Sequence, residues 1–406
     1  MKVAKFGGTS LAGAEEFTAV ATRILKDEEI KIAVVSAGGK KAGQPKVTDS
    51  LIAAYKTVSA GGSVQKALAP FAERLQKLTA KLKLQLNIEN LLMKIERGFI
   101  TEPTPDFLIS RGEYAYSLIA AEYLGRPFVD AAEIMKFNED GTFNYGFSDF
   151  LIRETYARTG GFVTGGFYGS FPDGKIKTLT RGGSDFSGAV IAAATNCDYY
   201  NYTDVSGFYD FDPSKIKCAK TIKKLSFRQA RILSEFGAGV LHPDSVLPLM
   251  NTDLKIYIKN TFSPLSDGTV VSKEGDKETF AAALGKNYFG VRLYGAGKGS
   301  GLLSSLTGEK FAPVLCVTDE DCVCAVIKGS GENFCDGLRT EKTELFSDMR
   351  LAYFTDSPNS EKGVASIKDA LPVFMSAKNR DGYYLSFAAV YEEKFIKILE
   401  EFMTTL

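Results

Sequence analysis

A glycine-rich stretch that contains an arginine and an aspartate has the residue types of an anion-binding site. It reads Arg181-Gly182-Gly183-Ser184-Asp185 and stands between a strand-like run and a helix-like run. Glycine lets backbone N–H groups approach a ligand closely, and a helix N-terminus adds partial positive charge. The Arg181 guanidinium suits a carboxylate or a phosphate, while Ser184 can cap the helix or donate to a ligand. Asp185 is either a first-turn charge or a group that places a cation or a nucleophile.

A second loop with acids and a glycine follows a little further along the chain. Residues 203–213, TDVSGFYDFDP, come after a strand-like run over 199–202, and the first motif comes after a strand-like run over 175–179. In open α/β sheets, ligands bind at the carboxyl ends of the strands. The spacing therefore predicts that both loops lie at one such edge, with a helix over 187–196 behind the first.

The N-terminus has the pattern of a phosphate cradle. A short strand ends in Lys5-Phe6-Gly7-Gly8-Thr9-Ser10, and a helix begins near Ala14. This order of strand, glycine pair, hydroxyls and helix suits a phosphate, although its spacing is not that of a P-loop. Lys5 is either a member of the site or a lysine that protects an edge strand.

Hydroxyl and carboxyl groups end or begin three further elements. Ser36 closes a strand over 31–37 and Thr48 opens the next helix, so both hydroxyls are expected at the edge of the first glycine turn, as ligand contacts or as caps. Ser110 and Glu113 have the spacing of a capping box for a helix over 114–124. The alternative is that Glu113 faces the site and receives a substrate ammonium group.

Length and composition limit the number of domains and the classes of partner. A chain of 406 residues is long enough for about two or three domains. With 49 basic and 49 acidic residues, it has no long-range field that would favour nucleic acid or an anionic membrane. The single histidine and the scattered spacing of the six cysteines predict no metal site and reduced thiols in a cytoplasmic protein. No apolar run has the length of a membrane span.

Beyond about residue 260 the order of the elements changes. Two βαββα-like units are expected in tandem, a duplicated small α+β module. The first has strands over 289–294, 313–318 and 322–328 and a helix over 301–306; the second has strands over 350–355, 373–377 and 383–390 and helices over 363–371 and 392–403.

Four motifs together resemble those of the aspartate kinases in the amino-acid kinase superfamily, and they occur in the same order between about Met1 and Asn260. They are residues 5–10, residues 110–113, residues 181–185 and residues 203–213. The paired C-terminal units are similar to the ACT domains that follow the kinase in that family. The resemblance implies an α/β amino-acid kinase fold, an open and mostly parallel sheet with helices on both faces, followed by two small α+β ACT-like modules. The implied domains are 1–262 and 263–406, with modules at about 280–345 and 346–406.

The same resemblance implies that the γ-phosphoryl group of ATP passes to the side-chain carboxylate of L-aspartate, with Mg²⁺ assisting, as the first step of lysine, threonine and methionine biosynthesis. Lys5 would contact the transferring phosphate, and Asp185 would orient this lysine and the metal-bound phosphates. Arg181 would bind the substrate α-carboxylate and Glu113 its ammonium. The remaining implied contacts are Gly7, Gly8 and Ser10 in the phosphate cradle, Ser36, Thr48 and Ser184 around the substrate, and Thr203, Asp204, Tyr209 and Asp212 on the nucleotide side.

One position departs from the family pattern. Gly239 stands where the family commonly has a lysine that contacts the nucleotide phosphates, so Lys215, Lys217 or a loop lysine would have to replace that charge. Two alternatives to an aspartate kinase are another amino-acid kinase, such as one that acts on glutamate, and an inactive paralogue that senses an effector. Exposed edge strands of the C-terminal modules also predict a homodimer, with an amino-acid effector as a possible partner.

Overall fold

The computed structural model describes residues 1–41, 43–179, 182–263, 265–294, 313–318, 322–329 and 342–406. They form two compact units, and neither is a single stretch of chain. The first unit comprises Met1–Gly207 and Val240–Glu274, and the second comprises Phe208–Gly239 and Gly275–Leu406. Among the described residues, no helix is both long and apolar enough to cross a membrane.

A mostly parallel sheet forms the centre of the first unit. Its strand order is β3-β4-β2-β1-β7-β9-β10, and only the β9–β10 pair within this order is antiparallel. The bounds are β1 Lys2–Phe6, β2 Ile30–Val35, β3 Phe128–Val129, β4 Phe162–Gly165, β7 Asp198–Thr203, β9 Ile256–Asn260 and β10 Thr269–Ser272. The inner strands β1, β2 and β4 are almost completely buried, as expected for parallel strands that are covered on both faces.

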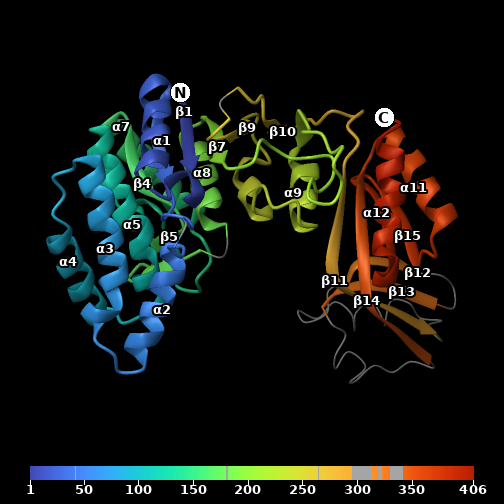
Figure 1. Ribbon diagram of the computed structural model, residues 1–406, viewed down its shortest axis with the longest axis horizontal. Coiled ribbons are helices and arrows are strands. Elements are labelled where there is room, and N and C mark those ends of the chain that lie inside the picture. Colours follow the sequence, from blue (N-terminus) through green and yellow to red (C-terminus); the bar gives the residue numbers. More distant parts are fainter. Residues whose placement is uncertain (42, 180–181, 264, 295–312, 319–321, 330–341) are drawn as a thin grey trace. The chain divides into compact units, whose positions relative to one another are not determined.

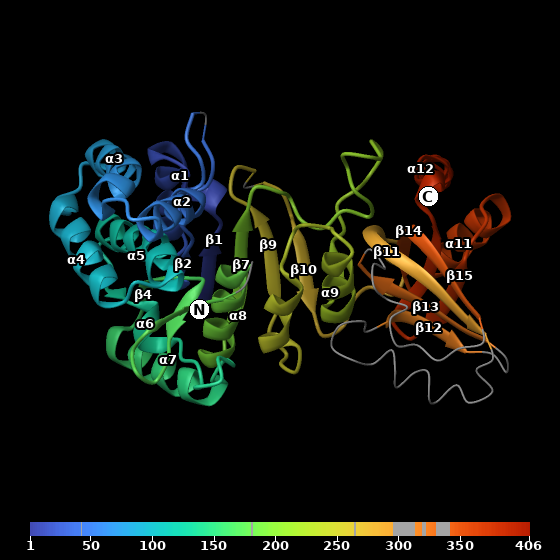
Figure 2. The same ribbon diagram turned by 90° about the horizontal axis from the view of Figure 1, so that it is seen from below.

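Helices cover both faces of this sheet. Helices α1, α2, α3 and α5 lie on one side, while α7 and α8 lie on the other (Figure 2). The bounds are α1 Ala14–Lys26, α2 Val47–Ser59, α3 Val64–Leu82, α4 Ile88–Thr101, α5 Pro105–Leu124, α6 Ala131–Ile134, α7 Tyr145–Thr159 and α8 Gly183–Ala194, with 3-10 turns η1 Gly8–Leu11 and η2 Pro243–Leu249. The fold predicted for the N-terminal part is confirmed.

The strand predicted over residues 175–179 is short and does not belong to the large sheet. It is β6, Ile176–Thr178, and it pairs with β5, Tyr168–Ser170, in a separate two-stranded sheet. Only Ile176 of β6 is buried, so the run lacks the continuous apolar character of the central strands. The polypeptide therefore reaches α8 from this hairpin and not directly from a strand of the large sheet, as the sequence had led us to expect.

The capping box predicted for Ser110 and Glu113 is wrong. Helix α5 begins at Pro105, and the Thr104 hydroxyl caps it by accepting a hydrogen bond from the Phe107 N–H at 3.1 Å. Proline at the first helical position costs no hydrogen bond, because that N–H would be unpaired in any case. Ser110 and Glu113 consequently lie in the buried interior of the helix, where Glu113 has no helix end to cap.

The second unit contains an antiparallel sheet with the order β12-β13-β11-β14-β16-β15. Its strands are β11 Ala282–Tyr294, β12 Pro313–Thr318, β13 Cys322–Lys328, β14 Lys342–Thr355, β15 Met375–Asn379 and β16 Gly382–Ala388. The remaining described elements are β8 Lys224–Ser226, α9 Phe227–Glu235, α11 Pro358–Ala370, η3 Ala389–Tyr391 and α12 Glu392–Met403 (Figure 1). The short helix predicted over 301–306 lies outside the described residues.

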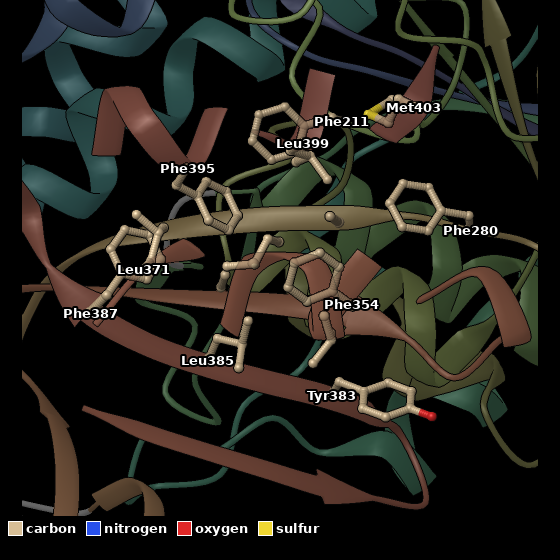
Figure 3. Packing of buried hydrophobic residues seen from close by; sticks show 14 of the residues in the cluster. Phe211, Phe280, Phe354, Leu371, Tyr383, Leu385, Phe387, Phe395, Leu399 and Met403 are labelled. Carbon is tan, nitrogen blue, oxygen red and sulfur yellow. The ribbon is translucent and has the colours of Figure 1, made fainter. Parts of the chain in front are cut away.

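An aromatic core holds α11 and α12 against this sheet (Figure 3). The ring centroid of Phe395 from α12 lies 4.9 Å from that of Phe387 on β16, and the two rings are stacked. Phe354 on β14 meets the same ring of α12, with the centroids 6.3 Å apart. A separate, smaller core gathers Phe289, Val291 and neighbouring side chains of β11 and β13. Two cores on one sheet fit the predicted pair of small α+β modules.

Candidate active site

The carboxyl ends of the parallel strands meet at one edge of the first unit's sheet. In the register of these strands, Phe6 lies opposite both Val35 and Tyr202. The Gly7 N–H donates to the Tyr202 carbonyl at 3.1 Å, and the Gly166 N–H donates to the Val35 carbonyl at 3.0 Å. The turns after β1, β2, β4 and β7 are thus linked to one another, as expected for the ligand edge of an open α/β sheet.

Lys5 is part of this edge and not a lysine of an exposed edge strand. Strand β1 lies between β2 and β7, and the Lys5 side chain is only 10% exposed. Its Nζ lies 2.5 Å from Asp185 Oδ1 in the first turn of α8 and 3.5 Å from Asn201 Oδ1 on β7. The Asn201 amide also donates to Asp185 Oδ1 at 3.1 Å. The three side chains form a triad that holds the ammonium group in place.

Sequence reasoning missed Asn201. It is buried and lies opposite Lys5 in the parallel register of β1 and β7. The sequence of β7 could have indicated it, because an asparagine stands among tyrosines in a strand. A buried amide needs hydrogen-bond partners, so such a residue is a candidate member of a polar site. Here the Asn201 side chain accepts from Lys5 and donates to Asp185, so it fixes the orientation of both charged groups.

The glycine pair after β1 allows two turns to pack tightly. A Cβ at Gly8 would lie 2.8 Å from the Ala37 carbonyl oxygen, and the Gly39 N–H donates to the Gly8 carbonyl at 2.7 Å. A Cβ at Gly7 would lie 3.6 Å from Lys5 Nζ, so this turn is next to the ammonium group. The glycine turn therefore brings backbone close to the Lys5 ammonium group, as a phosphate cradle requires.

Ser10 has a different environment from the other predicted cradle residues. Its side chain is fully buried, and Oγ lies 2.7 Å from Thr261 Oγ1. This hydrogen bond joins η1 to the residue that follows β9. Within the structure, the Ser10 hydroxyl thus serves to position the glycine turn.

Glu113 provides a buried carboxylate with spare hydrogen-bonding capacity. Its Oε1 accepts the Ala37 N–H at 3.1 Å. Its Oε2 is buried and has no hydrogen-bond partner among the described residues. Burial raises the pKa of Glu113 to about 7, although the Ala37 hydrogen bond and the nearby Arg111 act in the opposite direction. A cationic ligand group would satisfy Oε2 and favour the ionised carboxylate.

Close backbone contacts bring other predicted residues near Glu113. A Cβ at Gly165 would lie 3.2 Å from the Glu113 Cβ, and a Cβ at Gly112 would lie 3.0 Å from Val47 Cγ1. Val47 begins α2 and precedes Thr48. The end of β4 therefore packs against Glu113, and the start of α2 packs against the adjacent Gly112. Ser36 and Thr48, on the adjoining segments, are both half-buried.

The start of α8 packs against the turn after β4. A Cβ at Gly166 would lie 2.7 Å from the Ser184 Cα. Gly182, which precedes the helix, has a φ of 79°, a left-handed conformation that glycine adopts without strain. Asp185 and Ser184 thus lie in a helical first turn at the same edge as Gly166. Arg181, predicted to bind a carboxylate, lies outside the described residues.

Arg111 is buried beside Glu113 and stacks on aromatic rings. Its guanidinium carbon lies 4.6 Å from the Phe107 ring centroid, 4.7 Å from that of Tyr114 and 5.3 Å from that of Tyr168. Nε and Nη2 donate to the Ser110 hydroxyl at 3.2 and 3.0 Å. Arg111 thereby places a positive charge near the carboxylate of Glu113, which offsets part of the rise that burial causes in the pKa of that group.

The predicted nucleotide-side residues are divided between the two units. Thr203 and Asp204 belong to the first unit, where the Thr203 hydroxyl donates to Asp204 Oδ1 at 3.2 Å. Tyr209 and Asp212 belong to the second unit, where they line a cavity of about 130 Å³. The other lining residues are Phe211, Pro213, Lys215, Phe236, Gly237, Ala238, Ala282, Ala283 and Leu284.

Comparison with known proteins agrees with this fold. The features described above define an α/β protein in which the parallel strands end at one edge beside the Lys5–Asp185–Asn201 triad. The chain belongs to the Amino acid kinase family, whose profile matches residues 1–260. The superfamily predicted from the four motifs is confirmed.

Two aspartokinases are similar in sequence to part of this chain. Aspartokinase 3 of Bacillus subtilis is 34% identical over 67% of this chain and 64% of its own length. Lysine-sensitive aspartokinase 3 of Escherichia coli is 30% identical over 70% of this chain and 66% of its own length. The matched part of the chain therefore spans less than two thirds of each of these two relatives.

Among solved structures, the aspartate kinase of Clostridium acetobutylicum superimposes with a TM-score of 0.88, at 29% identity, and covers 99% of this chain and 100% of its own. Aspartokinase III of E. coli, in complex with aspartate and ADP, superimposes with a TM-score of 0.79 at 24% identity and covers 100% of both chains. These similarities extend through the C-terminal modules and confirm the predicted fold class of the whole chain.

Proposed function

We propose that this protein is an aspartate kinase, which transfers the γ-phosphoryl group of ATP to the side-chain carboxylate of L-aspartate and produces 4-phospho-L-aspartate and ADP. The main support is the Lys5–Asp185–Asn201 triad beside the glycine turn, which holds an ammonium group at the ligand edge. The names of the relatives agree with this activity.

The proposed reaction needs charge stabilisation more than proton transfer. A carboxylate oxygen of aspartate forms a new bond to the γ-phosphorus, and the bond from that phosphorus to the β,γ-bridging oxygen breaks, with its electron pair leaving on ADP. The carboxylate is already ionised at neutral pH, so no general base is required. The obstacle is the repulsion between two anions, which the Lys5 ammonium would reduce, while Asp185 and Asn201 would keep this ammonium oriented.

Glu113 is the proposed recognition group for the substrate ammonium. Its Oε2 is a buried acceptor without a partner in the part of the chain that the structure describes, and a positively charged donor fits it better than a neutral one. Arg181 is proposed to bind the α-carboxylate, with Ser36, Thr48 and Ser184 as further hydrogen-bonding groups. A glutamate substrate would carry one more methylene group, so recognition of both ends in a fixed pocket would favour the shorter amino acid.

For the nucleotide, we propose contacts from Gly7, Gly8 and Ser10 in the cradle and from Thr203 and Asp204. Tyr209 and Asp212 remain contacts that the family resemblance implies. The described residues contain no group of three or more His, Cys, Asp or Glu side chains that could hold a metal ion by themselves. We propose that Mg²⁺ is bound mainly through the nucleotide phosphates, with Asp185, which pairs with Lys5, as a neighbouring carboxylate. Mg²⁺ would supply charge neutralisation on the phosphate oxygens.

We propose kinase and regulatory domains at 1–262 and 263–406, a cytoplasmic enzyme of lysine, threonine and methionine biosynthesis, and control by an amino-acid effector. We also propose a homodimer through the C-terminal modules, because β12 and β15 are edge strands of their sheet within the described residues. A monomeric mass in light scattering at micromolar concentration would contradict the dimer.

The activity itself is tested by trapping the acyl phosphate with hydroxylamine in the presence of ATP, Mg²⁺ and either L-aspartate or L-glutamate. We expect hydroxamate formation with aspartate and little with glutamate. ADP binding without formation of hydroxamate from either amino acid would overturn the proposed activity and favour an inactive, effector-sensing protein.

A further inference from the structure

A buried arginine on α3 contacts the loops around the candidate site. The Arg74 residue is only 8% exposed. Within the part of the chain that the structure describes, its hydrogen bonds all go to backbone carbonyls: Nη1 donates to Pro45 at 2.6 Å, and Nη2 donates to Gly39 at 2.6 Å and to Ala12 at 3.1 Å. A charged side chain is rarely buried unless it has strong partners. A buried guanidinium that binds only backbone therefore serves to fix the segments around it.

Two of these carbonyls lie near the two ends of the loop between β2 and α2. Gly39 comes soon after β2, and Pro45 shortly precedes α2. Between them, the Lys41 N–H donates to the Gln44 carbonyl at 3.2 Å, and the Gln44 N–H donates to the Lys41 carbonyl at 2.8 Å. Because Arg74 binds both ends with one planar group, it closes the base of this loop.

The segments on both sides of the loop carry proposed contacts to the amino-acid substrate. Before it, the Ala37 N–H donates to Glu113 Oε1 at 3.1 Å. After it, the Val47 N–H donates to the Gly38 carbonyl at 3.0 Å, and Thr48 follows Val47 in the first turn of α2. The position of the loop therefore determines how these groups are held relative to one another.

The phosphate cradle is less dependent on Arg74. The Gly39 N–H does donate to the Gly8 carbonyl, at 2.7 Å. However, the cradle is also held by the Gly7 N–H, which donates to the Tyr202 carbonyl at 3.1 Å, and by the buried hydrogen bond of the Ser10 hydroxyl. Loss of Arg74 should thus loosen the loop more than the cradle.

A second anchor of the loop is partly exposed. Lys41 Nζ lies 2.9 Å from Glu16 Oε2, and these side chains are 38% and 22% exposed. Ion pairs that water can reach contribute little to stability, so this pair cannot replace the buried guanidinium. Lys40 is exposed, and the loop therefore contains lysines at which trypsin can cut once the loop is released.

We propose that Arg74 is a positioning residue for the amino-acid substrate: it closes the base of the loop between β2 and α2 and thereby holds the substrate contacts on both sides of that loop. The choice of L-aspartate as this substrate rests on the proposed function. Closure of the loop does not, because it can be measured without any substrate.

The kinetic test measures KM for L-aspartate and KM for ATP by hydroxamate formation with the full-length protein. We expect Arg74→Met to raise KM for L-aspartate about tenfold, because contacts on both sides of the loop lose their orientation, and to change KM for ATP by less than about threefold. Arg126→Met is the matched control. Arg126 also binds backbone, donating to the Ile30 carbonyl at 2.7 Å, but at the opposite end of β2 from the loop. Both KM values should stay within about twofold in Arg126→Met.

Limited digestion with trypsin needs no enzyme activity. Cleavage after Lys40 or Lys41, measured by mass spectrometry relative to cleavage elsewhere in the same chain, should be about fivefold faster in Arg74→Met than in wild type. It should be unchanged in Arg126→Met. The relative rate separates release of this loop from a general loss of stability.

Three results would overturn the proposal: a KM for L-aspartate that stays within twofold in folded Arg74→Met, equal changes in the KM values for L-aspartate and ATP, or equal effects in Arg74→Met and Arg126→Met. Unchanged relative cleavage after Lys40 and Lys41 would do so as well.

If Arg74→Met does not fold, Arg74→Lys provides a second readout. Lysine keeps the charge but lacks the planar fork that reaches both ends of the loop, so we expect KM for L-aspartate to rise about threefold. A wild-type KM in Arg74→Lys would contradict the proposed closure. Wild-type protein that forms no hydroxamate would refute the aspartate kinase activity alone, and the tryptic cleavage of Arg74→Met would then decide whether Arg74 closes the loop.

Discussion

The Lys5 ammonium and the Asp185 carboxylate form a largely buried ion pair, with Nζ and Oδ1 2.5 Å apart. One residue comes from the middle strand of a parallel sheet and the other from the first turn of α8, and Asn201 bridges them from β7. Burying two charges costs free energy unless further hydrogen bonds satisfy them. A buried ion pair therefore contributes little to the free energy of unfolding. Its position beside the glycine turn instead favours a role in binding and orienting a phosphate.

We expect Lys5→Met to lower kcat by about 10²- to 10³-fold, because a preorganised positive charge would be lost from the transition state. Asp185→Asn should lower kcat less, since the ammonium would remain but lose its orientation. Hydroxamate formation with saturating ATP and L-aspartate measures both effects. Lys2→Met is the matched control on the same strand, because Lys2 pairs with Asp27 and Glu29 away from the site. A loss in Lys2→Met comparable with that in Lys5→Met would contradict this role.

The raised pKa of Glu113 predicts a pH-dependent affinity for the acceptor. The substrate ammonium requires the ionised carboxylate, and this form gains population as pH rises through about 7 in the free protein. We therefore expect kcat/KM for L-aspartate to increase through about pH 7, with a much smaller change in the KM for ATP. Glu113→Gln should have a low and nearly flat kcat/KM profile. A wild-type profile without a rise in this range would argue against ammonium recognition by Glu113.

The same group predicts a change in stability with pH. The folded protein has a pKa of about 7 at Glu113 against an ordinary value of 4.5, so it binds this proton more tightly than the unfolded chain. The contribution is fully present below about pH 4.5 and is lost as pH rises through 7, at a cost on the order of 3 kcal/mol. The Tm of ligand-free wild type should thus fall relative to that of Glu113→Gln between about pH 5 and pH 8. A constant difference in Tm would contradict the expected ionisation.

Arg111 should set the midpoint of this ionisation. Its buried positive charge favours the carboxylate of Glu113, so Arg111→Met should shift the rise in kcat/KM for L-aspartate to higher pH. The loss of stacking on Phe107 and Tyr114 should also lower stability by about 1 to 2 kcal/mol. Arg153→Met, at an exposed ion pair with Asp149, is the control and should change neither property. A midpoint that does not move in Arg111→Met would rule out this electrostatic role.

The glycine turn offers a paired test of backbone packing. Gly8→Ala would place a Cβ 2.8 Å from the Ala37 carbonyl oxygen, and we expect a loss of about 1 to 3 kcal/mol together with weaker ATP binding. Gly146→Ala in α7 meets no atom within 4 Å and should leave ATP binding unchanged while raising stability by about 0.5 to 1 kcal/mol. Thermal unfolding and ATP titration measure the two effects. Wild-type behaviour of Gly8→Ala would show that the turn has room to adjust.

Much of the fold follows from local patterns. The strands over 313–318 and 322–328 and the helix over 392–403 were predicted with the observed bounds, because turn residues or charged caps stand directly beside apolar runs. The prediction failed at α5 and β6. Thr104 and Pro105 start α5 well before the apparent capping box, and β6 pairs in a small hairpin because its side chains are not apolar enough for the central sheet.

Site residues were predictable from the sequence where a single short segment contains the whole pattern. Gly7 and Gly8, and Ser184 with Asp185, are visible as turns between a strand and a helix, since only particular residue types fit these conformations. The contacts of Asn201 and Arg74 were not predictable, because each depends on partners from distant segments. Proposed roles of Arg181 and the nucleotide-side residues stay predictions.

By itself, the sequence determined where strands end, where glycine turns begin helices and that a lysine and an aspartate lie beside such turns. Only the tertiary structure decided that Lys5 meets Asp185 and Asn201, that one oxygen of Glu113 is buried without a partner among the described residues, and that Arg74 binds both ends of the loop between β2 and α2. The physical reason is that backbone propensity acts over a few neighbouring residues. Charge pairing and desolvation depend instead on which side chains the packed sheet and helices bring together.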